Sequence, residues 1–265
     1  MNNPKLGFVN KNRRELGMLG LLIVLVIITS WGTRESGVQA VFESKFLSSD
    51  NLKNISREIG IYGIFSIGVG IVIITAGIDL SVGSLMALLG VVFLYFVTPT
   101  ETRPDSFLAR IIPEIPWIAA IFLTLLIGTA VGLFQGLLVG KLKLQAFIVT
   151  LCGLLSYRGL ARFSADDTSI NISDSSQNLE FLRFLGEGSL ADVLTNGNGS
   201  GLLHSIPMSF IYLICFAIFF GIILHKSVFG RYIFASGRNE LATKYSGINT
   251  NIVIAFAYVI AGFCT

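Results

Sequence analysis

The feature of this sequence that most constrains its fold is a series of long apolar stretches with almost no charge. They lie near residues 16–32, 59–76, 82–98, 117–140, 144–160 and 207–225, and a further stretch opens at 251. A bilayer core about 30 Å thick needs about 20 apolar residues in helical conformation. Only 13% of the chain is charged, against about 25% in soluble domains. The sequence therefore predicts an all-α, polytopic transmembrane helical bundle of about seven spans, with residues 1–265 as one transmembrane domain.

The positions of lysine and arginine predict how the chain is oriented, because cytoplasmic loops retain these residues during insertion. Ten of the 19 lie in three segments that alternate topology places on one side: Lys5, Lys11, Arg13, Arg14, Lys141, Lys143, Lys226, Arg231, Arg238 and Lys244. We therefore expect a cytoplasmic N-terminus and a cytoplasmic loop over about 226–250. The polar segment of about 161–206 is then an extracytoplasmic loop, with one short helix near 179–185. The apolar stretch of 252–265 has no charge after it, so we also expect C-terminal truncation.

One span carries glycines at strict four-residue spacing, namely Gly128, Gly132, Gly136 and Gly140. This spacing places them on one helical face, and small residues are the usual contact surface between membrane helices. The pattern therefore predicts close helix packing. Gln135 lies beside this ridge, and its amide needs a hydrogen-bonding partner in an apolar span. It is either an interhelical hydrogen-bonding residue or part of a translocation path.

The segment Thr75–Leu85, TAGIDLSVGSL, places a carboxylate where an apolar span ends. An aspartate within a membrane segment usually pairs or lines a hydrated cavity. Glycines on both sides allow the backbone to leave helical geometry, so Asp79 or Ser81 could cap the following helix. The alternatives are a lining or gating position for Asp79, Ser81 and Ser84, and a cation site.

The expected cytoplasmic loop of 226–250 has its own local signals. Gly230 and Gly237 indicate turns, Asn239 is a suitable N-cap, and Glu240–Tyr245 reads as a short helix that Gly247 ends in the C′ position. A short capped helix between two spans could dock on a soluble motor protein. The alternative is a helix that lies in the membrane interface.

Enzyme motifs are missing from the sequence. It contains no phosphate-binding GxxxxGK[ST] loop, no GxSxG, no HExxH and only two histidines. Cys152, Cys215 and Cys264 lie in apolar runs without metal-ligand spacing. We expect no catalytic residue, cofactor, metal or nucleic-acid partner, and any transport must draw energy from a partner or an ion gradient.

Several segments together resemble the permeases of ribose, xylose, arabinose and galactose importers of the ATP-binding-cassette class. They are TAGIDLSVGSLMALLG, with Ala76 where the family usually has glycine; QAFIVTLCGLLSYRGL; GLLVGKLKL; and FGRYIFASGRNELATKYSGINTN. The resemblance implies a coupling loop that contacts an ATPase, with Gly230, Arg231, Gly237, Asn239, Glu240, Ala242, Ser246 and Gly247 as its residues.

The resemblance also implies the partners: a cytoplasmic ATP-binding subunit, a periplasmic or extracellular solute-binding protein, a second permease copy and membrane lipid. The expected protein is a multi-pass permease of the bacterial inner membrane that carries a monosaccharide or similar solute by alternating access. Two other hypotheses remain open from the residues, an ion-coupled secondary transporter that uses Asp79 and a non-transporting assembly subunit. The sequence does not select the solute.

Overall fold

The computed structural model describes residues 13–32, 45–99, 110–165, 180–189 and 206–265. The chain divides into two compact units. The first is formed by 1–57 and 189–207, and the second by 58–188 and 208–265. In the described ranges the elements are almost entirely helical, and no β-ladder occurs among them beyond an isolated bridge between Ser189 and Pro207. The predicted all-α helical membrane bundle is confirmed.

The first unit holds helix α2, Arg13–Gly32, a 3₁₀ turn over Lys45–Leu47 and the beginning of α3, Ser49–Ile74. Helix α2 matches the predicted span of 16–32 and is apolar on all its faces. Helix α3 begins ten residues before the predicted 59, because its first turns, SDNLKNISRE, are polar and precede the apolar run. The hydroxyl of Ser48 accepts the Asn51 N–H at 3.4 Å and thereby caps this start.

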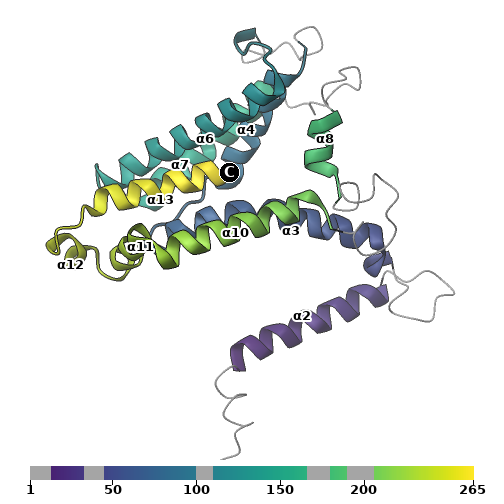
Figure 1. The fold of residues 1–265 in the computed structure, drawn as a ribbon, viewed down its shortest axis with the longest axis horizontal. Coiled ribbons are helices and arrows are strands. Elements are labelled where there is room, and N and C mark those ends of the chain that lie inside the picture. Colours follow the sequence, from purple (N-terminus) through teal and green to yellow (C-terminus); the bar gives the residue numbers. More distant parts are fainter. Residues whose placement is uncertain (1–12, 33–44, 100–109, 166–179, 190–205) are drawn as a thin grey trace, which may run out of the picture. The chain divides into compact units, whose positions relative to one another are not determined.

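The second unit contains the rest of α3 and helices α4, α6, α7, α8, α10, α11, α12 and α13 (Figure 1). Their bounds are α4 Val82–Val97, α6 Trp117–Gly140, α7 Ala146–Ala165, α8 Glu180–Glu187, α10 Met208–Lys226, α11 Val228–Arg238, α12 Glu240–Tyr245 and α13 Thr250–Cys264. Every predicted span coincides with a helix. Helix α7 continues to 165, so the expected loop of 161–206 begins later than predicted, and most of it lies outside the described residues.

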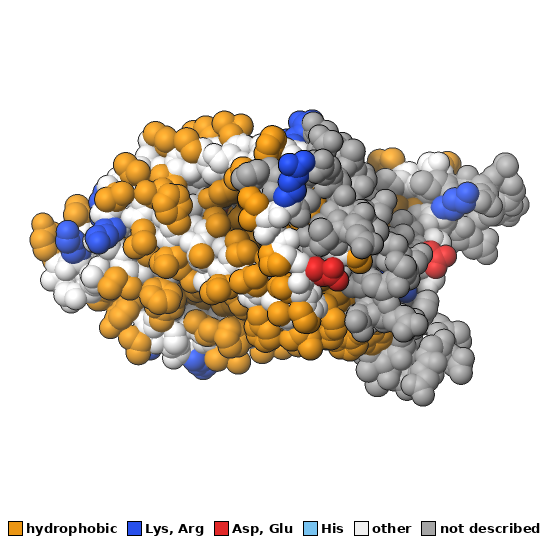
Figure 2. Space-filling model, turned by 90° about the horizontal axis from the view of Figure 1, so that it is seen from above, with side chains coloured by type: hydrophobic (Ala, Val, Ile, Leu, Met, Phe, Trp, Pro, Cys, Tyr) orange, Lys and Arg blue, Asp and Glu red, His pale blue; other side chains and the backbone are white. Residues whose placement is uncertain are grey.

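Five of these helices, α2, α3, α6, α7 and α10, are long and apolar enough to cross a membrane by length and composition. Helices α4 and α13 have 16 and 15 residues, which at 1.5 Å per residue is about 24 Å or less. The predicted number of about seven spans thus corresponds to five long helices and two shorter apolar ones within the described part of the chain. Hydrophobic side chains cover much of its surface (Figure 2), as a lipid-facing protein requires.

Helix α13 packs along α6 and also contributes to the main buried cluster. That cluster joins α3, α10, α11 and α13 through Ile71, Val72, Phe220, Ile233, Val253, Ile254, Ala257, Tyr258, Ala261 and Cys264. A second cluster lies at the end of α4 and the start of α6, where Phe96, Val97 and Ala120 are buried. Helix α8 contributes Leu182 to this second cluster. The short helix predicted near 179–185 is confirmed in α8.

Candidate functional site

The glycines of α6 lie directly against the backbone of α13. A β-carbon at Gly132 would lie 2.3 Å from the carbonyl oxygen of Tyr258 in α13, and one at Gly136 would lie 2.6 Å from that of Ala255. Equivalent carbons at Gly128 and Gly140 would lie 2.6 and 2.5 Å from carbonyl oxygens of α13. Any larger side chain on this ridge would separate α6 from α13. The structure therefore places all four glycines against one neighbouring helix.

Between α3 and α4 the chain leaves helical geometry over residues 75–81. Ala76 turns the backbone with a φ of 61°, in the left-handed region that L-residues other than glycine rarely adopt. Ser81, at the end of this segment, contacts Gly153, where a β-carbon would lie 3.2 Å from the β-carbon of Ser81. Gly153 is seven residues into α7, or about 10 Å along its axis. The non-helical segment therefore enters the helical bundle and does not form an external turn.

Neighbouring helices supply hydrogen bonds to this segment. The carbonyl of Ile78 accepts the hydroxyl of Tyr258 in α13 at 3.1 Å. The hydroxyl of Thr150 in α7 lies 3.4 Å from the same carbonyl and 2.9 Å from the Ala146 carbonyl of its own helix, and its single proton is shared between these acceptors. Unpaired backbone groups at membrane depth cost several kcal/mol each, on the order of a lost hydrogen bond in hydrocarbon. Tyr258 thus stabilises the interruption, and Thr150 is within reach of the same carbonyl. Neither residue was predicted as part of the site, because they lie far away in the sequence.

Asp79 and Ser81 form the polar centre of this segment. The Asp79 carboxylate accepts both the N–H of Ser81, at 2.9 Å, and its hydroxyl, at 2.7 Å. Ser81 is the N-cap residue of α4, but its side chain makes no capping hydrogen bond, and Ser84 donates its hydroxyl to the Ser81 carbonyl at 2.7 Å. The prediction that the Ser81 side chain caps α4 is therefore wrong. Asp79 instead fixes the backbone just before the helix.

Gln135 extends the same network into α6 and α7. Its Nε2 donates to the Ser81 hydroxyl at 2.9 Å and to the Tyr157 hydroxyl at 3.2 Å. Gln135 is 2% exposed, and Ser81 and Ser84 are also buried, whereas Asp79 is partly exposed. The interhelical hydrogen bond considered for Gln135 is present. Tyr157 was not predicted as part of this network. It lies four residues after Gly153 and therefore on the same face of α7, and this spacing is the sequence signal that could have identified it.

The loop of 226–250 contains two helices, α11 and α12, where the sequence predicts one helix and two turns. Gly230 and Gly237 lie inside α11, so the prediction of turns at these residues is wrong. Both are instead sites of close approach: β-carbons there would lie 2.0 Å from the Leu224 carbonyl oxygen and 1.8 Å from that of Ile74. The helix needs glycine at these places because backbone from α10 and α3 contacts it.

Helix α12 has the predicted bounds and caps. The Oδ1 of Asn239 accepts the N–H of Ala242 at 2.9 Å. Gly247 has a φ of 85°, its N–H bonds to the Lys244 carbonyl, and the N–H of Ile248 bonds to that of Thr243. This arrangement is a Schellman motif. The predicted N-cap and the predicted C′ glycine are confirmed.

Glu240 ties α12 to the rest of the unit. Its Oε1 pairs with the ammonium of Lys143, in the turn between α6 and α7, and accepts the hydroxyl of Thr250 at 3.1 Å. The hydrogen bond from Lys143 and its positive charge hold the pKa of Glu240 below the ordinary 4.5, against a smaller opposing effect of partial burial. The turn with Lys141 and Lys143 therefore lies at the same end of the unit as the loop of 226–250, as the charge pattern requires.

The outer side of α12 presents two large side chains that the sequence analysis did not single out. Leu241 is 67% exposed and Tyr245 is 88% exposed. Residues four apart lie on the same helical face, so the two form one apolar surface at the end of the unit. Arg231, Ala242 and Ser246, which the resemblance assigns to the coupling loop, are also exposed.

Comparisons with known proteins agree in the family that they identify. The family model described as branched-chain amino acid transport system / permease component matches residues 51–265. The ribose import permease protein of Haemophilus influenzae is 34% identical over 91% of this chain, and that of Bacillus subtilis is 30% identical over 94%. The fructose import permease protein of Bifidobacterium longum is 29% identical over 78% of the chain.

The chain spans 63% and 65% of the two ribose permeases and 50% of the fructose permease. No solved structure matches the chain.

Proposed function

The chain belongs to this permease family, whose model matches four fifths of it, and from that membership we propose that it is the transmembrane subunit of an ATP-binding-cassette importer. It is a multi-pass inner-membrane protein with the helical bundle described above. The proposed solute is a monosaccharide or a similar polyol, because relatives that match most of this chain are named for the import of ribose and fructose.

The observation that carries the proposal is the rigid attachment of α12. The short helix is capped at both ends, and its Glu240 is bonded to Lys143 and Thr250 of two other elements. Leu241 and Tyr245 extend from it without burial. A helix that is fixed on one side and apolar on the other suits the transmission of force from a soluble ATPase to the spans.

In the proposed mechanism the ATPase and the solute-binding protein each bind one conformation of a permease pair more tightly. This difference in affinity shifts the pair between inward-open and outward-open states. The ATPase binds at α12 on the cytoplasmic side, with Leu241 and Tyr245 in a groove of its surface. The loop residues Gly230, Gly237, Asn239, Glu240 and Gly247 have positioning roles, since they set the shape of the loop.

Asp79 is the proposed path-lining residue of the broken-helix site. It is the only partly exposed member of the four candidates, while Ser81, Ser84 and Gln135 are buried and hydrogen-bonded around it. Both hydrogen bonds to Asp79 from the described residues reach the same oxygen, Oδ1, and a carboxylate whose other oxygen can accept suits the hydroxyl groups of a sugar. Ser81 and Gln135 then act through Asp79 by fixing its orientation.

The test is co-purification from membranes of the native host with a tag at the N-terminus. The wild-type chain should recover an ATPase, and the double variant Leu241→Ser/Tyr245→Ser should lose it while its membrane insertion is unchanged. Ile111→Ser is the matched control, because Ile111 is 59% exposed near the start of α6, at the end opposite to α12.

Equal recovery by the double variant and wild type would contradict docking at α12. Solute uptake that follows an ion gradient and survives depletion of ATP would instead support the secondary transporter. If assembled complexes are recovered and solute uptake does not depend on this chain, the hypothesis of a non-transporting assembly subunit would be supported.

A further inference from the structure

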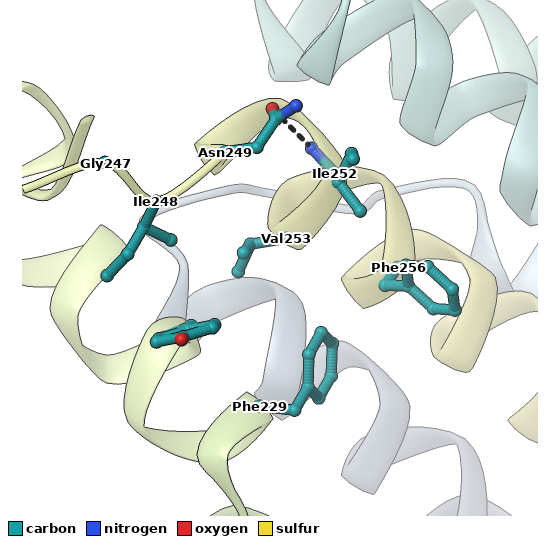
Figure 3. A pocket seen from close by; sticks show the side chains of 8 residues that line it. Phe229, Gly247, Ile248, Asn249, Ile252, Val253 and Phe256 are labelled. Atoms are coloured by element: carbon teal, nitrogen blue, oxygen red, sulfur yellow. Dashed lines mark hydrogen bonds between the residues drawn. The ribbon is translucent and has the colours of Figure 1, made fainter.

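Two apolar grooves flank the first turns of α13. One lies between α6 and α13, has a volume of about 430 Å³, and is walled by Leu133, Leu137 and Val259. The other lies between α11 and α13, has a volume of about 400 Å³, and is walled by Phe229 and Tyr232 (Figure 3). Both volumes fall within the roughly 300–1,000 Å³ of sites that bind small molecules.

A ridge on α13 separates the two grooves and belongs to both. Ile252 and Phe256, four residues apart, line each of them and are about half exposed. Phe256 meets Phe229 edge to face, with ring centroids 5.7 Å apart, and both rings line the second groove (Figure 3). The two grooves therefore lie on either side of an apolar ridge on one helix.

The two grooves also share a polar end. Asn249, the N-cap of α13, lines both of them, and Lys141 and Asn251 line the first. Lys141 is exposed and has no ion pair among the described residues, whereas its neighbour Lys143 is paired with Glu240. The N-terminus of a 15-residue helix adds partial positive charge at the same place. This end therefore favours an anion.

We propose that these two grooves bind one anionic phospholipid, with its phosphate at Lys141 and Asn249 and one acyl chain in each groove. Two apolar grooves that share a polar end with an exposed lysine match a molecule with two apolar chains and one anionic head. A helix from another protein would instead fill a single groove. Basic pockets between membrane helices are known to hold anionic headgroups, and buried methylene groups add to the affinity. The proposal does not depend on the transported solute or on ATP.

The experiment is native mass spectrometry of the full chain in detergent, titrated with phosphatidylglycerol or with phosphatidylcholine of the same acyl chains. Phosphatidylglycerol should bind more tightly. Lys141→Gln should weaken phosphatidylglycerol binding about fivefold, the change expected from loss of one lysine contact with an anionic head. Lys141→Arg should retain it. Lys226→Gln, which removes an exposed cation outside both grooves, should bind like wild type.

A second variant tests the apolar part. Leu137→Trp fills the first groove from a position that is 43% exposed, so it should weaken binding of both lipids while the circular dichroism spectrum stays that of the wild type. Equal affinity for the two lipids, or equal losses in Lys141→Gln and Lys226→Gln, would overturn the proposal. So would a lipid-free dimer that Leu137→Trp disrupts, because a second copy would then occupy the groove.

Discussion

Glu240 and Lys143 form an ion pair across 97 positions of sequence, and this pair joins α12 to the turn between α6 and α7. Thr250, the first residue of α13, donates to the same carboxylate oxygen. Helix α12, the start of α13 and the turn after α6 are thus held together at one carboxylate. A displacement of α12 would be transmitted to α13 through Thr250 and to the α6–α7 turn through Lys143, which is what coupling to a soluble motor requires.

Glu240→Gln should reduce the acid sensitivity of the chain. The pKa of Glu240 is lowered in the folded state, so its stabilising contribution is complete above the pKa of the unfolded chain and is lost as the pH falls through the lower folded value. Both partners are over 40% exposed, which limits the contribution to about 0.2–1 kcal/mol. Thermal unfolding in detergent between roughly pH 6 and pH 3 should therefore show a smaller loss of Tm for the variant than for wild type.

Glu114→Gln is the control for this measurement, because Glu114 is an exposed carboxylate near the other end of α6. It should keep the acid sensitivity of the wild type. If Glu240→Gln and wild type lose Tm in parallel, the ion pair does not persist in solution.

Gly132→Leu should separate α6 from α13. The added β-carbon would lie 2.3 Å from the Tyr258 carbonyl oxygen, and backbone cannot move aside as a flexible side chain can. We expect the free energy of unfolding to fall by about 1–3 kcal/mol, the usual cost of overpacking. Gly90→Leu is the control, since no atom lies within 4 Å of a β-carbon there. Unfolding in denaturant should distinguish the two, and equal stability would mean that the glycine ridge faces lipid.

The sequence predicts the helices well and their contacts only in part. The bounds of 117–140 for α6 are correct because its apolar run stops abruptly at Pro116 and at Lys141. Gly230 and Gly237 were assigned to turns because glycine often ends a helix, but here it permits contact with the backbone of α10 and α3. Pattern alone does not separate these two uses of glycine.

The candidate site shows the same limit. Asp79, Ser81 and Gln135 were identified from the sequence because polar groups in apolar runs are conspicuous. Tyr258 and Thr150 were missed, since each is one polar group in an ordinary span, and their role depends on contacts across 180 and 72 positions. Only the folded bundle brings them to Ile78.

Ala76→Gly should stabilise the chain. Ala76 has a φ of 61°, a conformation that costs L-residues about 1–2 kcal/mol. Glycine removes that strain but loses about 0.4–1 kcal/mol through its freer unfolded state, so the net gain expected from the difference is about 0–1.6 kcal/mol. Ala87→Gly within α4 should instead destabilise by about 0.5–1 kcal/mol. If Tm falls in both variants, the left-handed turn at Ala76 is not populated.

The losses of stability caused by Tyr258→Phe and Thr150→Val should be strongly non-additive. Each single change leaves one hydroxyl within hydrogen-bonding distance of the Ile78 carbonyl, because Thr150 can turn its proton from the Ala146 carbonyl to that of Ile78. Each single change should therefore cost about 0.5–1.5 kcal/mol. The double variant leaves that carbonyl without either donor inside the bundle, and the cost of a buried unpaired group, about 1–3 kcal/mol, then appears in full. A double-mutant cycle on unfolding free energies should therefore give a loss greater than the sum of the single changes.

Thr124→Val provides the control for the cycle. The Thr124 hydroxyl is buried in α6 with no hydrogen-bonding partner among the described residues, so its removal should be neutral or stabilising and should add simply to Tyr258→Phe. Additive losses in both pairs would mean that water or lipid replaces the missing donors at Ile78. The broken-helix segment would then be open to solvent from the start, and Tyr258 and Thr150 would not be what holds it inside the bundle.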